Sequence, residues 1–168
     1  MKWLSSNRWR ALLVFAPVVP AILWWSPWSR NSAPPVRLEA SLSARQLKVV
    51  QAGRVIRTYG IAVGTPSHPT PRGAFRTGEI DWNPAWVPPD EPWAKNKKPQ
   101  APGSPRNPIQ GVKIYFRAPD YYIHGTNNPG SIGEAASHGC IRMTEGDAKS
   151  LARLIQHAGG SVPLLVRG

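Results

Sequence analysis

The sequence predicts a mostly β domain with one α-helix in its C-terminal half, preceded by a hydrophobic N-terminal helix. Three observations lead to this prediction. Short stretches of alternating apolar and polar residues recur from residue 36 onward, separated by turns rich in Gly, Pro and Ser. One stretch, over 144–156, has the apolar spacing of an amphipathic helix. The first 28 residues contain a long apolar run, which is typical of a targeting or membrane segment.

The N-terminal segment has the pattern of an export signal. Lys2, Arg8 and Arg10 precede an apolar run over 11–25. A basic start followed by roughly 7–15 apolar residues is typical of a signal peptide, whereas a membrane span needs about 20. Because the run nears that length if it continues to Trp28, and no clear cleavage site follows, we favour a retained anchor over a cleaved signal. Both interpretations export the rest of the chain, and we expect it in the periplasm.

The whole sequence divides into three segments. We interpret residues 1–28 as the signal peptide or membrane anchor, 29–35 as a polar linker, and 36–168 as the domain. About 135 residues are enough to bury one core without disulfide bonds. We find no internal repeat. The strands that we expect from alternation cover 36–42, 46–51, 55–63, 73–80, 112–116, 121–124 and 161–166.

The predicted helix carries its own start and stop signals. Thr144 and Asp147 have the spacing of a capping box with Asp in place of Glu. An apolar face with helical spacing follows, and the pair Gly159-Gly160 ends the pattern. We therefore expect a helix over 144–156.

Residues 82–111 form a long segment that contains many prolines and three tryptophans, Trp82, Trp86 and Trp93. Loops longer than about 12–15 residues inside a compact domain are usually functional or disordered. We interpret this segment as a flap over the active site, and a disordered surface insertion is the alternative.

The charge excludes one class of function. The formal net charge is +12, but the Lys and Arg residues are scattered along the chain. No helix-turn-helix, zinc finger or aromatic RNA-binding motif accompanies them, so we expect no nucleic-acid partner. The charge fits attraction to an anionic wall or to inner-membrane lipid, or simply a solvated surface. We expect a monomer.

Chemistry is indicated by the single cysteine, Cys140, in a Gly-containing turn just before the predicted helix. His124 and His138 lie within 16 positions of it. An imidazole can activate a thiol as a nucleophile, and backbone N–H groups of such a turn can bind an oxyanion. Two other interpretations fit the same residues. Cys140 could be a small buried apolar residue, or it could join the two histidines in a zinc site that lacks an obvious fourth ligand.

The stretch from His124 to Met143 resembles the L,D-transpeptidase catalytic domain, also called YkuD-like. The resemblance rests on His124-Gly125-Thr126, on Ser131-Ile132-Gly133, and on the segment Ser-His-Gly-Cys-Ile-Arg-Met over 137–143. Upstream motifs agree in order and are found at 63–64, 70–75 and 84–89. The resemblance covers roughly residues 36–167 and implies a β-sandwich of mixed sheets.

The resemblance implies roles for residues of the turn and its neighbours. Cys140 would be the nucleophile and His124 its general base, with the Gly125 carbonyl orienting the imidazole. His138 would have a supporting role. The N–H groups of 138–140 would form the oxyanion hole. The other implied site residues are Ser137 and Gly139 in the turn, and Arg142, Tyr122 and Trp86 at the substrate.

The resemblance also implies a reaction. Cys140 would attack the meso-diaminopimelate–D-Ala bond of a peptidoglycan tetrapeptide stem and form a thioester, which an amine then resolves. The enzyme would thereby modify the cell wall and cell shape, and carbapenems would acylate it. No metal or cofactor is implied.

Other acceptors would give other functions on the same site. Water as acceptor would give a carboxypeptidase or endopeptidase, and an outer-membrane lipoprotein is another acceptor. A non-catalytic wall-binding module is the alternative of another class.

Overall fold

The computed structural model describes residues 35–168. The predicted N-terminal helix over 1–28 lies outside the described residues, and so does most of the predicted linker. Among residues 35–168, no helix combines the length and apolar character that crossing a bilayer requires.

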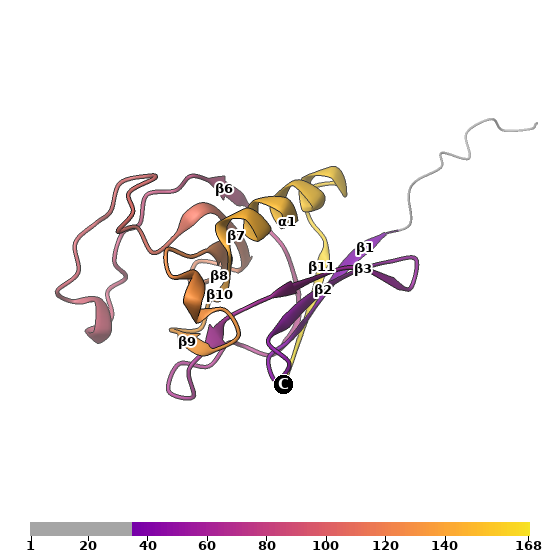
Figure 1. The fold of residues 1–168 in the computed structure, drawn as a ribbon, viewed down its shortest axis with the longest axis horizontal. Helices are drawn as coiled ribbons and strands as arrows, with labels where there is room; N and C mark the ends of the chain where they lie inside the picture. The colour runs from indigo at the N-terminus through magenta and orange to yellow at the C-terminus, as the bar shows by residue number, and fades with distance from the viewer. Residues whose placement is uncertain (1–34) are drawn as a thin grey trace, which may run out of the picture. The chain divides into compact units, whose positions relative to one another are not determined.

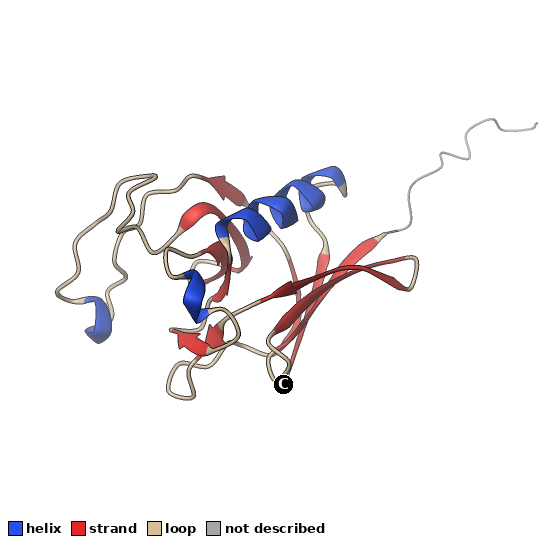
Figure 2. Cartoon of the chain, viewed as in Figure 1, coloured by secondary structure: helices blue, strands red, loops and turns tan. Residues whose placement is uncertain are grey.

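Within this range the chain is mostly β with a single α-helix, as the sequence predicts (Figure 2). The strands are β1 Val36–Ser41, β2 Gln46–Gln51, β3 Arg54–Gly60, β4 Val63–Gly64, β5 Gly73–Arg76, β6 Ile80–Trp82, β7 Gln110–Arg117, β8 Tyr121–Gly125, β9 Ala135–Ser137, β10 Ile141–Met143 and β11 Pro163–Arg167. The helices are α1 Glu145–His157 and the short 3-10 turns η1 Pro92–Ala94 and η2 Pro129–Ser131.

Both main sheets are mixed. The five-stranded sheet has the order β3-β2-β1-β11-β5, in which β1 and β11 run parallel and the other pairs antiparallel. Strands β1, β2, β3 and β11 of this sheet are labelled in Figure 1. The four-stranded sheet has the order β10-β8-β7-β6, in which only β10 and β8 run parallel. Strands β4 and β9 form a small parallel pair. The mixed-sheet architecture implied by the resemblance is therefore present.

The core face of the four-stranded sheet is marked by isoleucines in register. Ile141 pairs with Ile123, Ile123 with Ile114, and Ile114 with Ile80. The first three are fully buried, and Ile80 packs against the same cluster. Side chains alternate along a strand, so the residues between these isoleucines lie on the opposite face of the sheet. That face carries the candidate site.

Helix α1 packs against β7 and β8. Its apolar side chains enter the core, and its start is capped as predicted, since the Thr144 hydroxyl accepts a hydrogen bond from the Asp147 N–H at 3.2 Å. Gly159, at φ 102°, follows the helix and adopts a conformation that L-residues avoid. The buried residues of the helix are Ala148, Leu151, Ala152 and Ile155.

Two predicted strands are each divided, because the chain changes sheets within them. Residues 55–63 do not form one strand: β3 ends at Gly60, and Ala62 then pairs with Arg142 of β10. Residues 73–80 are interrupted at Thr77, whose N–H bonds to Val162 O, while the next N–H bonds to Tyr115 O of the other sheet. The sequence analysis joined the residues on both sides of each break into one strand.

The sequence analysis also missed β9 and β10. It placed Cys140 in a turn that leads directly to the helix, whereas the strand Ile141–Met143 lies between them. A strand of this length is too short to show periodicity. It forms because β8 offers it a parallel partner.

Candidate active site

The candidate site is built on two neighbouring strands. Cys140 immediately precedes β10, and Arg142 of that strand pairs in register with His124 of β8. His124 in turn pairs with Lys113 of β7. Because Ile123 and Ile141 point into the core, Arg142, His124 and Lys113 share the opposite face.

Aromatic and cationic contacts confirm that these side chains share a face. The ring centroids of Tyr122 and His124 are 5.3 Å apart, and those of Tyr122 and Tyr115 are 5.8 Å apart. The Lys113 ammonium lies 4.3 Å from the Tyr115 ring centroid and 4.4 Å from that of Tyr122. Cys140, Arg142, Tyr122, His124, Lys113 and Tyr115 together are called the active-site face below.

Cys140 keeps part of its surface open, and its thiol donates to the Asp120 carbonyl at 3.5 Å. Loss of hydration raises the pKa of the thiol to about 11. Hydrogen bonding with Tyr122 and the positive charges of Arg142 and Lys113 lower the pKa of the thiol, but less than desolvation raises it. At neutral pH the sulfur is therefore protonated.

His124 is buried, with 5% of its surface exposed, and its Nδ1 lies 2.8 Å from Gly125 O. Burial lowers the pKa of the imidazole to about 4, against the hydrogen bond to Gly125, which raises it. A carbonyl oxygen can only accept, so Nδ1 carries the proton and Nε2 is left as a base. The resting pair is thus a neutral thiol and a neutral imidazole of fixed tautomer.

Ser137 shapes the turn before Cys140. Its hydroxyl donates to Cys140 O at 2.6 Å and accepts from the Gly139 N–H at 3.1 Å. The sequence analysis assigned the Gly139 N–H to an oxyanion hole, but this N–H already bonds to Ser137. Gly139 has φ 111°, and a Cβ there would lie 2.7 Å from Cε1 of Tyr121, so only glycine fits.

His138 is exposed. Its ring stacks on Trp93 with centroids 3.9 Å apart and an interplanar angle of 13°, and it meets the His68 ring edge-on at 4.8 Å. Desolvation and, after it, the charge of His68 lower the pKa of His138. The sequence analysis gave His68 only an ordinary surface role, and no local signal predicted this contact.

Trp93 belongs to η1, inside the Pro-rich loop over 83–109. That loop therefore reaches the turn that carries Cys140. Trp86, which the sequence analysis placed at the substrate, has a different environment. It is 8% exposed, its backbone pairs with Gln100, and it lines a cavity of about 380 Å³ within the loop region.

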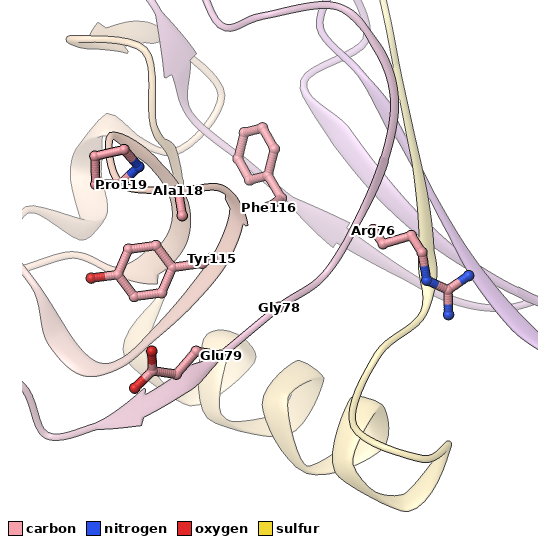
Figure 3. Close-up of a pocket in the computed structure, with 7 residues that line it drawn as sticks. All are labelled: Arg76, Gly78, Glu79, Tyr115, Phe116, Ala118 and Pro119. Atoms are coloured by element: carbon pink, nitrogen blue, oxygen red, sulfur yellow. The ribbon is translucent and has the colours of Figure 1, made fainter.

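Figure 3 shows the residues that line a second cavity, of about 460 Å³. Tyr115 is the residue that the cavity and the active-site face share, and Cys140 and His124 do not line the cavity. Its walls are Arg76, Gly78, Glu79, Tyr115, Phe116, Ala118 and Pro119.

The zinc alternative finds no ligand set here. Among residues 35–168, no group of three or more His, Cys, Asp or Glu side chains is placed to hold a metal ion. His124, His138 and Cys140 are not brought together in that way.

The chain is similar to known proteins over most of its length. Residues 35–163 match the family model of the L,D-transpeptidase catalytic domain, YkuD. A Bacillus licheniformis protein named as an L,D-transpeptidase YkuD is 36% identical over 121 residues, which are 72% of this chain and 61% of that protein.

Solved structures share the fold. An L,D-transpeptidase from Mycobacterium smegmatis aligns over 80% of this chain and 59% of its own, with a TM-score of 0.63 and 23% identity. L,D-transpeptidase 3 from Mycobacterium tuberculosis, solved with a faropenem-derived adduct, aligns over 80% of this chain and 61% of its own, with a TM-score of 0.56 and 20% identity. The chain thus spans about three fifths of these proteins. With the family match over most of its length, this chain belongs to the L,D-transpeptidase (YkuD) catalytic domain family.

Proposed function

We propose that this protein is a peptidoglycan L,D-transpeptidase in which Cys140 forms a thioester with the donor stem peptide. One observation carries the proposal: a protonated thiol and a neutral imidazole lie on adjacent strands, and Gly125 O fixes the imidazole with Nε2 as its base. A neutral imidazole with a free Nε2 can act as a general base toward a protonated thiol. Family membership supports the same chemistry.

The first half-reaction cleaves the bond between meso-diaminopimelate and the terminal D-Ala. The Cys140 sulfur attacks the carbonyl carbon while the thiol proton moves to His124 Nε2. The C–N bond then breaks, and the imidazolium returns the proton to the departing amine of D-Ala. A thioester and free D-Ala are the products.

The second half-reaction reverses these roles. An acceptor amine attacks the thioester carbon, and His124 takes a proton from the amine. The C–S bond breaks, and the proton returns to the sulfur, which regenerates the neutral thiol. The new amide is a crosslink when the amine belongs to a second stem peptide.

Other groups stabilise the charge that develops. The N–H groups of His138 and Cys140 are the donors of the turn that remain for the oxyanion, because the Gly139 N–H bonds to Ser137. Arg142 lies beside His124 in the sheet and supplies a guanidinium for a substrate carboxylate. Since peptidoglycan lies outside the cytoplasm, we also propose that the domain acts there.

The test is to incubate the purified protein with tetrapeptide muropeptides and to identify the products by mass spectrometry. We expect release of D-Ala and crosslinked dimers. Cys140→Ser should abolish both, and His124→Ala should lower the rate by about a hundredfold or more. His157→Ala, on the exposed end of α1, is the matched control. Release of D-Ala without any dimer would indicate water as the acceptor, and no release would refute the proposal.

Acylation by a penem gives a second measurement of the reactivity of the Cys140 sulfur. Because a solved protein of this fold carries a faropenem-derived adduct, we expect faropenem to acylate Cys140. Peptide mapping should find the added mass on Cys140. Labelling by iodoacetamide without labelling by faropenem would argue against an acyl-accepting site.

A further inference from the structure

Lys113 is the cation of the active-site face to which neither the sequence nor the family comparison assigns a role. It is half-buried in the middle of β7, one strand beyond His124. Its ammonium lies over two tyrosine rings, at 4.3 and 4.4 Å from their centroids. Such contacts hold the charge in place but leave its N–H groups free to bind a ligand.

Lys113 is also without an acidic partner. Within residues 35–168, the ion pairs join Arg37 and Arg167 to Glu39, and Lys149 to Glu145. Asp81, the neighbour of Lys113 in register on β6, forms no ion pair with it. No carboxylate of the described residues therefore competes with a ligand for its ammonium. The charge of Lys113 acts on the active-site face, because it lowers the pKa of both His124 and Cys140.

The order of these groups across the sheet matches the order of atoms in the reaction. Cys140 and Arg142 lie on the β10 side of His124, and Lys113 lies on the β7 side. His124 must lie between the sulfur and the amine nitrogen, because it passes a proton from one to the other. The acyl component is therefore on the β10 side, and the amine component extends toward β7.

The amine component is the same kind of molecule in both half-reactions. The departing D-Ala is an α-amino acid of D configuration, and so is the amine-bearing centre of a diaminopimelate acceptor. In each, the carboxylate carbon is two bonds from the reacting nitrogen. Neighbouring strands are about 4.8 Å apart, a distance that this carboxylate and the lysine side chain together can span.

We propose that Lys113 binds the α-carboxylate of the amine component, first that of the departing D-Ala and then that of the incoming acceptor. Resting on the proposed function, this assigns a subsite for a D-amino-acid carboxylate, with Tyr115 and Tyr122 positioning the ammonium. Arg142 is then left for carboxylates of the acyl component.

The experiment compares acceptors that differ only in the carboxylate. The thioester is formed first on the wild type and on Lys113→Gln, and D-alanine or D-alaninamide is then added as acceptor. Loss of a charged hydrogen bond should lower the ratio of kcat/KM for D-alanine to that for D-alaninamide roughly tenfold or more. Because the charge of Lys113 also acts on His124 and Cys140, thioester hydrolysis is measured beside it as the change that is common to all acceptors. Lys113→Arg should retain most of the preference for D-alanine.

The matched control is Lys48→Gln, another half-buried lysine in a strand of the other sheet, which should leave the preference unchanged. An equal loss with both acceptors, or no loss with either, would overturn the proposal. Thermal unfolding of each variant separates a folding defect from the loss of a contact.

A binding measurement separates this proposal from the proposed function. D-Alanine and D-alaninamide are titrated into Cys140→Ala and followed by NMR, which requires no turnover. Tighter binding of D-alanine that disappears in Cys140→Ala/Lys113→Gln supports the subsite even if the stem peptide never acylates the enzyme. Equal binding of both molecules, or D-alanine binding that survives the double substitution, counts against Lys113 even if transpeptidation is observed.

Discussion

The thiol of Cys140 keeps its proton at neutral pH. Its pKa is raised to about 11 by desolvation, and the pKa of His124 is lowered to about 4 for the same reason. Both shifts favour the uncharged forms, so the pair is not a thiolate and an imidazolium at rest. In the proposed reaction, proton transfer must then accompany attack of the sulfur, so a reactive thiolate forms only when a carbonyl is present.

This state predicts a specific pH dependence. His124 accepts a proton only while neutral, and a lowered pKa extends its neutral form down to about pH 4. The rate of acylation by faropenem should therefore be nearly constant from about pH 5 to 9 and fall below pH 4. Stopped-flow measurements on the wild type and on His124→Ala, which should lose the acid limb, check this. An acid limb near pH 6.5 would show that burial does not control His124.

At the scale of elements, the loop over 83–109 is the feature with a functional consequence. Its Trp93 stacks on His138, next to the turn of Cys140, and the Lys97 ammonium lies 5.9 Å from the Trp93 ring centroid. The loop thus contacts the turn through an aromatic stack. This contact supports the interpretation of the segment as a flap that limits the access of water to the thioester.

We predict that weakening this contact changes the fate of the thioester. Trp93→Ala should raise hydrolysis relative to transfer by about threefold to tenfold, since roughly 0.5–1.5 kcal/mol of stacking is lost. Deleting Pro92–Pro105 should act in the same direction and leave iodoacetamide labelling of Cys140 intact. The measurement is the ratio of hydrolysed to crosslinked product, with Trp82→Ala as the control. An unchanged ratio in both loop variants would make the segment a tolerated insertion.

At the scale of the whole molecule, the site depends on the core beneath it. Ile123 and Ile141 are fully buried, and they alternate with Tyr122, His124 and Arg142 on the active-site face. The core side chains therefore fix the position and register of β8 and β10, the strands of the active-site face. Register matters because a slip of one residue would turn the side chains of the active-site face into the core.

Truncating a core side chain should accordingly lower the free energy of unfolding. Ile123→Ala should lower the free energy of unfolding by about 2–5 kcal/mol, because it removes buried methyl groups and leaves a cavity. Val55→Ala, at a position 54% exposed in β3, should change it by less than about 0.5 kcal/mol. Urea unfolding of the two variants tests the comparison. Equal effects would mean that the isoleucines are not the core of the four-stranded sheet.

The sequence by itself determined much of the local structure. Alternation located most of the strands, and the capping residues Thr144 and Asp147 located the helix to within a residue at each end. The motif around Cys140 identified the family, and the Gly125 carbonyl was foreseen as the partner of His124. These features depend on neighbours in the chain, so the sequence contains their signals.

Only the tertiary structure decided the rest. Strand β10 exists because β8 offers it a parallel partner, and the predicted strands 55–63 and 73–80 divide where the chain changes sheets. Lys113 reaches the active-site face through pairing with β8, and Trp93 and His68 meet at His138 from distant segments. Such contacts join residues far apart in sequence, and burial, which sets the pKa values of Cys140 and His124, is a property of the assembled core.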